Sequence, residues 1–297
     1  MVSPYVDRVL VQPTTSTSKT QTVRSFLFYL LVPTIQITPH QTIHYLEYNP
    51  KGTPPILLLH GLGATGASWE FQIQPLFEAG FHVIAPDIRG FGNSSYPGGR
   101  LRVSNLSADM VSLLQSLQVG PAHVVGLSMG GAIAVQLALD GPNRVKSLVL
   151  VSTFASLRPK NNRLWFYFAF RFLLVHTLGL PTQARLVAKR IFPHENQAAF
   201  REKFLQQINQ ADPKGYRAVM RALAFFDVTE RLPEINIPTL VVSGEEDTTI
   251  ALTTQQHLSH WMPNTHHVII PKGGHAITVE QPGIFNETMI SFLQKLS

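Results

Sequence analysis

The sequence predicts an α/β fold in which a mostly parallel sheet is covered by helices on both faces and interrupted by a helical insertion. From residue 41 onward, short apolar runs alternate with helical patterns and are joined by glycine-rich turns. This alternation is typical of parallel sheets, whose crossover helices bury both faces. Strand-like segments stop at about residue 155 and return after residue 232, which indicates an insertion between two strands.

Each expected strand is a short apolar run that ends in a turn signal or a polar residue. In chain order these runs cover residues 43–48, 55–59, 81–85, 122–126, 145–151, 238–243 and 267–270. Between them, Leu106, Met110 and Leu113 share one face of an expected helix. A second helix is expected over residues 129–139, where Gly141-Pro142 stops it.

These segments predict how the chain is organised. Residues 1–24 are polar and include a patch rich in Thr and Ser, so we expect an N-terminal arm. Residues 25–154 and 233–297 should form the core, and residues 155–232 a helical cap. The 297 residues are enough for such a core with a modest cap.

The composition fits a folded globular protein and excludes several other classes. The chain is 44% hydrophobic and 14% charged, which argues against disorder. Its net charge is +6, but Lys and Arg are scattered, so we expect no nucleic-acid partner. The lack of cysteine excludes disulfides, thiolate catalysis and Cys-ligated zinc. The twelve histidines show no zinc-binding spacing, so no metal site is expected either.

The distribution of apolar residues also bears on location. No apolar stretch reaches the roughly 18–20 residues needed to span a bilayer. The apolar run at residues 26–32 is too short and too late for a secretory signal. We therefore expect a cytoplasmic protein. A weak contact with a membrane surface and the oligomeric state stay open.

The most informative chemical motif is a serine between two glycines, at the junction of an expected strand and helix. It reads Gly126-Leu-Ser128-Met-Gly130. A serine hydroxyl becomes a nucleophile when it is exposed, held near a base and faced by donors for the developing oxyanion. A tight strand-to-helix turn exposes the hydroxyl, and the glycines leave room for the crowded backbone. We expect Ser128 to be a nucleophile.

Further motifs follow in a fixed order along the chain. They are His60-Gly-Leu-Gly63, Asp87-Ile-Arg-Gly-Phe-Gly-Asn-Ser94, the serine motif, Gly244-Glu-Glu-Asp247, Gly274-His275 and Glu280-Gln-Pro282. From about residue 41 to the C-terminus, this order resembles the α/β-hydrolase superfamily, in its serine esterase and lactonase branch with a helical cap. The resemblance implies the α/β-hydrolase fold.

The same resemblance implies a catalytic triad and an oxyanion hole. Ser128 would attack the substrate, His275 would act as the base, and Asp247 would orient that base. The backbone amides of Leu62 and Met129 would hold the oxyanion. No cofactor is implied.

Two of these roles have competitors in the sequence. His275 lies in a glycine-flanked loop after the last apolar run, whereas the family uses the histidine of the oxyanion loop, here His60, to hold loop backbone. Glu245 and Glu246 are adjacent alternatives to the acid, and the resemblance selects Asp247.

Three other charged residues are expected to have no chemical role. Asp87 and Arg89 flank a glycine-rich turn, where they can pin the loop backbone. The spacing of Asp109 places it on the exposed side of its helix.

The cap contains the most aromatic segment of the chain. Residues 165–175 read WFYFAFRFLLV, with apolar positions on every helical face, more than one buried stripe requires. The surplus can line an apolar substrate pocket or touch a lipid surface. We expect Trp165 and Phe168 of this segment, together with Trp69, to bind substrate.

The predicted function is hydrolysis of a carboxylic ester with an apolar acyl or alcohol part, through an acyl-enzyme. The alternatives on the same triad are hydrolysis of a lactone or enol-lactone, carbon–carbon bond cleavage, and acyl transfer or perhydrolysis. Residues 105–153 are similar to enol-lactone hydrolases. Epoxide hydrolases and haloalkane dehalogenases use an Asp nucleophile, so Ser128 argues against them. A ligand receptor that keeps the triad and a membrane-associated lipid hydrolase are the remaining alternatives.

Overall fold

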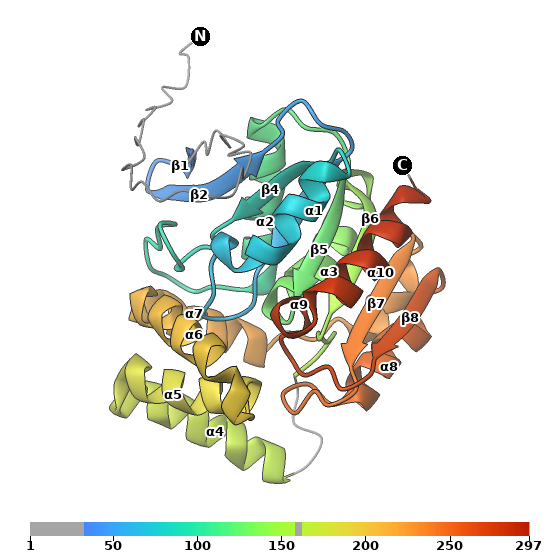
Figure 1. Cartoon of the computed structure of the whole chain (residues 1–297). Coiled ribbons are helices and arrows are strands. Elements are labelled where there is room, and N and C mark those ends of the chain that lie inside the picture. Colours follow the sequence, from blue (N-terminus) through green and yellow to red (C-terminus); the bar gives the residue numbers. More distant parts are fainter. Residues whose placement is uncertain (1–32, 158–161, 297) are drawn as a thin grey trace, which may run out of the picture.

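The computed structural model describes residues 33–157 and 162–296, without the side chains of residues 162–164, 167 and 168. Within these residues, eight strands form one sheet with helices on both faces (Figure 1). The α/β architecture expected from the sequence is therefore confirmed. The predicted N-terminal arm, residues 1–24, lies outside the described residues.

The sheet is mostly parallel. Its strand order is β1-β2-β4-β3-β5-β6-β7-β8. The pairs β1–β2 and β2–β4 are antiparallel, and the other pairs are parallel. The strands are β1 (Thr34–Thr38), β2 (Gln41–Tyr48), β3 (Pro55–Leu59), β4 (His82–Pro86), β5 (Ala122–Leu127), β6 (Val145–Val151), β7 (Thr239–Gly244) and β8 (Thr265–Ile270). The parallel central strands are almost wholly buried because helices cover both faces.

All seven strands predicted from apolar runs are present, and β1 is an additional strand. The run TIQIT of β1 alternates polar and apolar residues, and its polar residues are exposed. It pairs with β2 at the edge of the sheet, where only one side of the strand packs on the core. So short an alternation carries little hydrophobic signal, which explains why the sequence pattern missed it.

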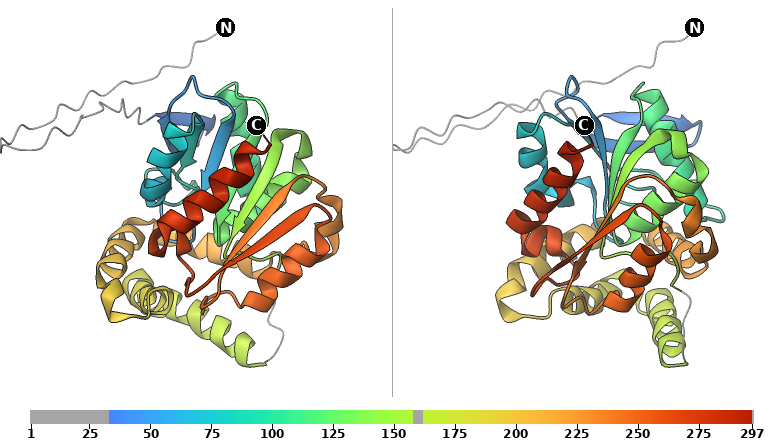
Figure 2. Two further views of the ribbon diagram at one scale, coloured as in Figure 1. Left: turned by 45° about the vertical axis from the view of Figure 1, so that its right-hand side comes forward. Right: turned by 90° about the vertical axis from the view of Figure 1, so that its right-hand side faces the viewer.

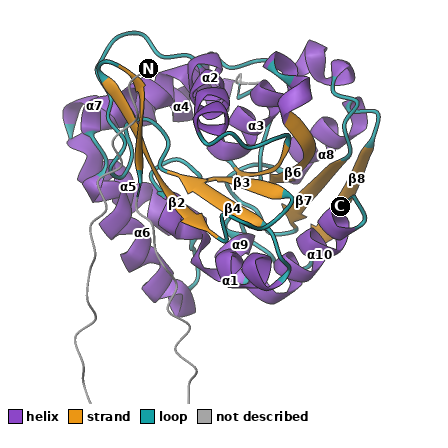
Figure 3. Ribbon diagram, turned by 90° about the horizontal axis from the view of Figure 1, so that it is seen from above, coloured by secondary structure: helices purple, strands orange, loops and turns teal. Residues whose placement is uncertain are grey.

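Helices cover the two faces of the sheet, as the view from above shows (Figure 3). On one face lie α2 (Val103–Ser116), α3 (Met129–Asp140) and α8 (Leu252–Trp261), and on the other lie α1 (Glu70–Glu78), α9 (Ile277–Glu280) and α10 (Pro282–Gln294). A separate cluster of buried apolar side chains fills the space on each face. Among the described residues, none of the helices is both long enough and apolar enough to cross a bilayer.

The insertion between β6 and β7 contains α4 (Asn162–Thr177), α5 (Gly179–Ile191), α6 (Ala198–Gln210) and α7 (Pro213–Ala224). These helices lie together at one end of the sheet (Figures 1 and 2). The two connections of the insertion run side by side, because Ser156 and Asp227 form a β-bridge and the Val228 amide donates to the Ala155 carbonyl over 3.0 Å. The insertion therefore leaves and rejoins the core at one place.

Candidate active site

Ser128 lies at the turn between β5 and α3, with φ 53° and ψ −110°. Few residues other than glycine adopt this left-handed region, so the surrounding structure must hold the turn in place. The Ser128 amide donates to the Val151 carbonyl over 2.9 Å, and the Thr153 hydroxyl donates to the Ser128 carbonyl over 2.6 Å. The backbone of the turn is thus fixed from β6, and its side chain lines a cavity.

The two glycines of the serine motif are required by close packing of backbone. A methyl group added at Gly130 would overlap the carbonyl of Leu59, at the end of β3. A methyl group at Gly126 would overlap the backbone of Gly130 itself. The glycines therefore let the first turn of α3 lie directly against the strand ends.

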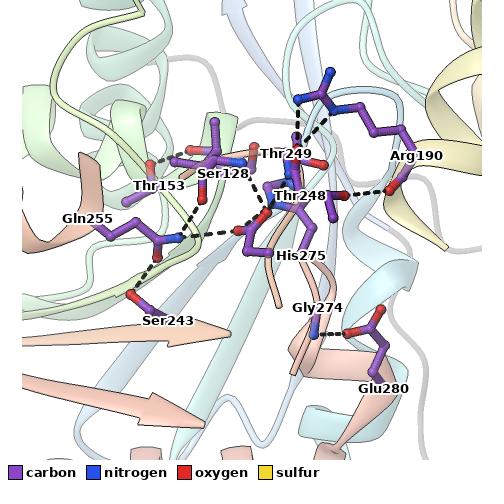
Figure 4. A network of polar contacts seen from close by, with 12 residues as sticks. Ser128, Thr153, Arg190, Ser243, Thr248, Thr249, Gln255, Gly274, His275 and Glu280 are labelled. Carbon is purple, nitrogen blue, oxygen red and sulfur yellow. Dashed lines mark hydrogen bonds and ion pairs between the residues drawn. The ribbon is translucent and has the colours of Figure 1, made fainter. Parts of the chain in front are cut away.

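Asp247 and His275 come together from two loops that follow β7 and β8. The Nδ1 atom of His275 lies 3.1 Å and 3.0 Å from the two carboxylate oxygens of Asp247 (Figure 4). Both side chains are buried, whereas Glu245 and Glu246 are exposed. Of these three adjacent acids, Asp247 is the one that the fold brings to the histidine.

The surroundings of Asp247 favour its charged form. Burial by itself would raise the pKa of Asp247, but the facing imidazole of His275 and two backbone amides outweigh burial and hold the pKa below its usual value. The amides are those of Thr249 and Ile250, which donate over 2.8 Å and 2.9 Å. The carboxylate is therefore ionised at neutral pH and can accept a hydrogen bond from Nδ1 of the His275 ring.

A buried polar network lies behind Asp247 and was not predicted from the sequence. The side-chain amide of Gln255 donates to Asp247 over 3.2 Å, and its oxygen accepts from the Ser243 hydroxyl over 2.6 Å (Figure 4). Nε2 of His267 lies 2.8 Å from the same hydroxyl. One signal could have revealed it: Gln255 lies three residues before Leu258, on the buried face of α8. A polar residue at an apolar-face position needs partners.

The loop after β3 is held by His60. Its Nε2 atom accepts from the Ile88 amide over 2.9 Å, so the ring hydrogen sits on Nδ1 and is donated to the Gly61 carbonyl 2.8 Å away. Burial lowers the pKa of His60, which fits this neutral form. The loop places Leu62 on the wall of the cavity that contains Ser128.

Met129 is the first residue of α3, so its amide has no acceptor within the helix. Its apolar side chain is buried in the core. The backbone amide is therefore the hydrogen-bond donor that Met129 offers next to Ser128. The helix dipole adds a partial positive charge at this end. The start of α3 can therefore stabilise a negative oxygen beside the serine.

Asp87 ties together three segments around this loop. It accepts from the amides of Gly66 and Asn93 over 2.8 Å and 2.9 Å, and lies 2.8 Å from Nδ1 of His44. Burial would raise its pKa, but these three partners lower it below the usual value. Its contacts are structural, as expected from the sequence.

The expectation that Asp109 is exposed was wrong. Its side chain is buried and forms a two-pronged ion pair with the Arg89 guanidinium. Asp109 lies beside the buried face of α2, and Arg89, from the loop after β4, contacts it. A contact between distant segments, invisible to local periodicity, buries the carboxylate.

A cavity of about 200 Å³ lies between the core and the cap, and both Ser128 and His275 line it. Its walls are mainly apolar side chains of the core and the cap: Leu62, Trp69, Leu127, Phe154, Phe192, Phe200, Phe204 and Leu223. The cap therefore contributes aromatic side chains to the cavity that contains the proposed nucleophile.

The three predicted substrate-binding residues differ in position. Trp69 is buried and lines the cavity. Trp165 is 57% exposed and is not among the described residues that line the cavity, because this face of α4 points away from the core. The side chain of Phe168 lies outside the described residues. We therefore keep only Trp69 in the proposed substrate pocket.

Polar contacts fasten the cap to the core around the cavity. Lys203 of α6 pairs with Glu70 of α1, and the Arg190 guanidinium donates to the Thr248 carbonyl over 2.7 Å, next to Asp247 (Figure 4). The Thr248 hydroxyl donates back to the Arg190 carbonyl over 2.9 Å. These contacts hold the cap over the acid loop.

Glu280 links the cap to the histidine loop. It accepts from the Gly274 amide over 2.7 Å, one residue before His275, and from the side chain of Gln197 in the cap over 3.1 Å. Burial raises the pKa of Glu280, although the Gly274 amide partly offsets this effect. The Glu-Gln-Pro motif noted in the sequence thus positions the loop that carries the histidine.

Comparison with known proteins places this geometry in a family. A family model described as the alpha/beta hydrolase fold matches residues 54–282. The chain belongs to the α/β-hydrolase family. The matched residues include the serine motif, the acid loop and the histidine loop.

Individual members of the α/β-hydrolase family are similar over nearly their full length. A candidate carbamate hydrolase, RutD of Variovorax paradoxus, is 31% identical over 261 residues, which cover 86% of this chain and 97% of that protein. The 3-oxoadipate enol-lactonase 2 of Acinetobacter baylyi is 30% identical over 259 residues, covering 86% and 94%. The structure of a thermophilic esterase from Thermogutta terrifontis has a TM-score of 0.76 and 28% identity, covering 89% and 97%. This chain is therefore a hydrolase of the α/β family.

Proposed function

We propose that this α/β-hydrolase is a carboxylesterase-type serine hydrolase that cleaves small esters with an apolar acyl or alcohol part. One observation carries the proposal: Ser128 and His275 line the same mainly apolar cavity, and Nδ1 of His275 is held by the buried Asp247. A serine at a strand-to-helix turn, an oriented imidazole and a backbone amide at a helix start are components of acyl transfer.

The proposed reaction has two halves. In the first, Oγ of Ser128 attacks the carbonyl carbon while Nε2 of His275 takes the hydroxyl proton, and the carbonyl oxygen becomes an oxyanion held by the amides of Leu62 and Met129. The bond between the carbonyl carbon and the alcohol oxygen then breaks. His275 then gives the proton to the leaving alcohol. In the second half, His275 takes a proton from water, and the water attacks the acyl carbon. The bond between this carbon and Oγ of Ser128 then breaks, and His275 returns the proton to Oγ as the acid leaves. Asp247 keeps Nδ1 protonated and stabilises the imidazolium in both halves.

The cavity supports a small, apolar substrate. Its volume of about 200 Å³ is below the range of roughly 300–1,000 Å³ found for sites that hold drug-sized ligands. Aromatic walls favour apolar groups through the hydrophobic effect. We expect short acyl chains to be hydrolysed faster than long ones.

A lactone is the second candidate substrate, and the similarity to an enol-lactonase over 86% of this chain supports it. A lactone is a cyclic ester, so the same attack, oxyanion and acyl-enzyme apply, with the alcohol still attached to the acyl group. A compact ring also suits a small cavity. The two candidates differ in substrate shape, not in chemistry.

Hydrolysis of p-nitrophenyl esters of increasing acyl length, with lactones assayed in parallel, tests the proposal. Ser128→Ala should lower kcat by roughly 10³-fold or more while the unfolding transition stays in place. Ser291→Ala, which removes an exposed hydroxyl from α10, should keep full activity. Turnover retained in Ser128→Ala would refute the assignment. Tight binding of these compounds without turnover by the wild type would favour a receptor instead.

A further inference from the structure

Helix α4 leaves a broad apolar face uncovered. Its side chains Leu174 and Val175 are buried against the rest of the protein. On the opposite side, Phe166 is 66% exposed and Leu173 is 60% exposed. Among the described side chains of α4 and its connection to α5, the exposed large apolar ones are Trp165, Phe166, Phe170, Phe172, Leu173 and Leu178. Single exposed apolar residues are normal, but a contiguous patch marks an interaction site.

The next helix extends this surface. Leu186 of α5 is exposed, and so are Arg185 and Lys189 on the same helix. Helices α4 and α5 pack against each other and form the end of the cap farthest from the N-terminal strands (Figure 1). We call the exposed side chains of α4 and α5 the outer cap face.

The outer cap face belongs to the most basic part of the chain. Residues 162–194 contain five Lys or Arg and no Asp or Glu. From residue 162 to residue 224 the charge is +7, because ten basic residues face three acidic ones, whereas the whole chain carries +6. The rest of the protein therefore has no net positive charge. Lys and Arg that look scattered in the sequence are concentrated in the cap.

This combination of aromatic side chains and positive charge selects the partner. A second copy of this chain would bring two positive faces together, which is unfavourable. Helices that lie on lipid surfaces have Trp, Phe and Leu on the buried side, with Lys and Arg beside them to contact anionic headgroups. We propose that the outer cap face docks onto an anionic lipid surface.

Docking would place the cavity next to the bilayer. Arg171, Val187 and Ile191 belong to the same two helices and line the cavity from their inner side. An apolar ester dissolved in a membrane would then have a short path to Ser128. The lipid binding itself does not depend on the proposed hydrolysis, so Ser128→Ala should bind vesicles as the wild type does.

Flotation of the full chain with vesicles tests the proposal. We expect binding to vesicles with 30 mol% phosphatidylserine in phosphatidylcholine, and at least about tenfold weaker partitioning to pure phosphatidylcholine. The double variant F166S/F170S should lower partitioning about tenfold or more, because two phenyl rings no longer enter the interface. The charge variant R185E/K189E should also bind more weakly, and 0.5 M NaCl should reduce binding of the wild type.

Matched variants on the core control for exposure and charge. Trp261→Ser removes an exposed aromatic side chain from α8, and K51E/K295E reverses two exposed charges outside the cap. Both should bind vesicles as the wild type does. Phe166 and Phe170 are not among the described cavity-lining residues, so F166S/F170S should hydrolyse a water-soluble p-nitrophenyl ester at the wild-type rate. This activity shows that the variant is folded.

Three results would overturn the proposal. One is the absence of binding to both vesicle types. Another is binding that F166S/F170S retains in full, which would assign the contact to another part of the chain. The third is a dimer in analytical ultracentrifugation that F166S/F170S dissociates, because the outer cap face would then join two copies.

Discussion

The side-chain amide of Gln255 donates a hydrogen bond to Oδ2 of Asp247, with 3.2 Å between nitrogen and oxygen. The backbone amides of Thr249 and Ile250 bind the other oxygen, Oδ1. Gln255 is fully buried, and its amide group also donates to the Ile250 carbonyl over 3.0 Å. Both oxygens of the carboxylate are therefore held in place before any substrate binds.

Replacing Gln255 by leucine should disturb the site through Asp247. The carboxylate loses its Oδ2 donor and can rotate, so we expect kcat for p-nitrophenyl esters to fall roughly tenfold with little change in KM. Stability should fall by about 1–3 kcal/mol, because the Ser243 hydroxyl loses its acceptor. Gln256→Leu, at the exposed neighbouring position, is the control. Wild-type kcat in Gln255→Leu would show that Asp247 needs no such support.

The Asp247→Asn variant tests the proposed acid. An amide can accept from the Thr249 and Ile250 backbone as the carboxylate does, but it neither keeps Nδ1 of His275 protonated nor stabilises the imidazolium. We expect kcat to fall by about 10³–10⁴-fold with the fold intact. Glu246→Gln, the exposed neighbour, should have no effect. A reversed pattern would make Glu246 the acid.

Gly130→Ala should destabilise the protein strongly. The new methyl group would overlap the carbonyl of Leu59 at the end of β3, and a backbone contact can be relieved only by moving α3. We expect a loss of about 3 kcal/mol or more in urea unfolding. The control is Gly120→Ala, where no atom lies within 4 Å of the added carbon. Equal stability of the two variants would contradict the close packing of α3 on β3.

Glu280→Gln should change how stability depends on pH. Because burial raises the pKa of Glu280, ionising this group costs free energy in the folded state. Its favourable contribution is present below the usual glutamate pKa of about 4.3 and is lost as pH rises through the raised pKa. Glutamine cannot ionise and can still accept from the Gly274 amide. The variant should therefore gain stability relative to the wild type as pH rises.

Urea unfolding of Glu280→Gln and wild type at pH 4 and pH 8 measures this difference. Glu287→Gln on the exposed face of α10 is the matched control, and its difference from the wild type should not vary with pH in this way. If Glu280→Gln instead becomes less stable relative to the wild type between pH 4 and pH 8, the charged form of Glu280 is the stabilising one.

Most of the core could be predicted because its signals are local. Seven strands were visible as short apolar runs, and the serine motif lies between one of these strands and a helix. The edge strand β1 was missed because half of its residues face solvent. The predicted roles of Ser128, His275 and Asp247 remain proposals, since a motif predicts a position and not a reaction rate.

Other features required the fold. Asp109 was expected to be exposed from its helical spacing. That spacing cannot reveal Arg89, which lies 20 residues earlier in the chain and contacts the carboxylate. Gln255 carries no motif, and its contact with Asp247 arises from the packing of α8 on the sheet. Trp165 was expected in the pocket because aromatic content does not reveal which face of a cap helix points inward.

The sequence by itself determined where most strands, helices and chemical motifs lie along the chain, because each of these features depends on residues close together in the chain. Only the tertiary structure decided which of three adjacent acids meets His275, which cap side chains line the cavity and which remain on the outer face. These outcomes depend on contacts between segments far apart in the chain, such as the loops after β7 and β8 and the helices inserted between β6 and β7. Their geometry is set by how the elements pack against each other.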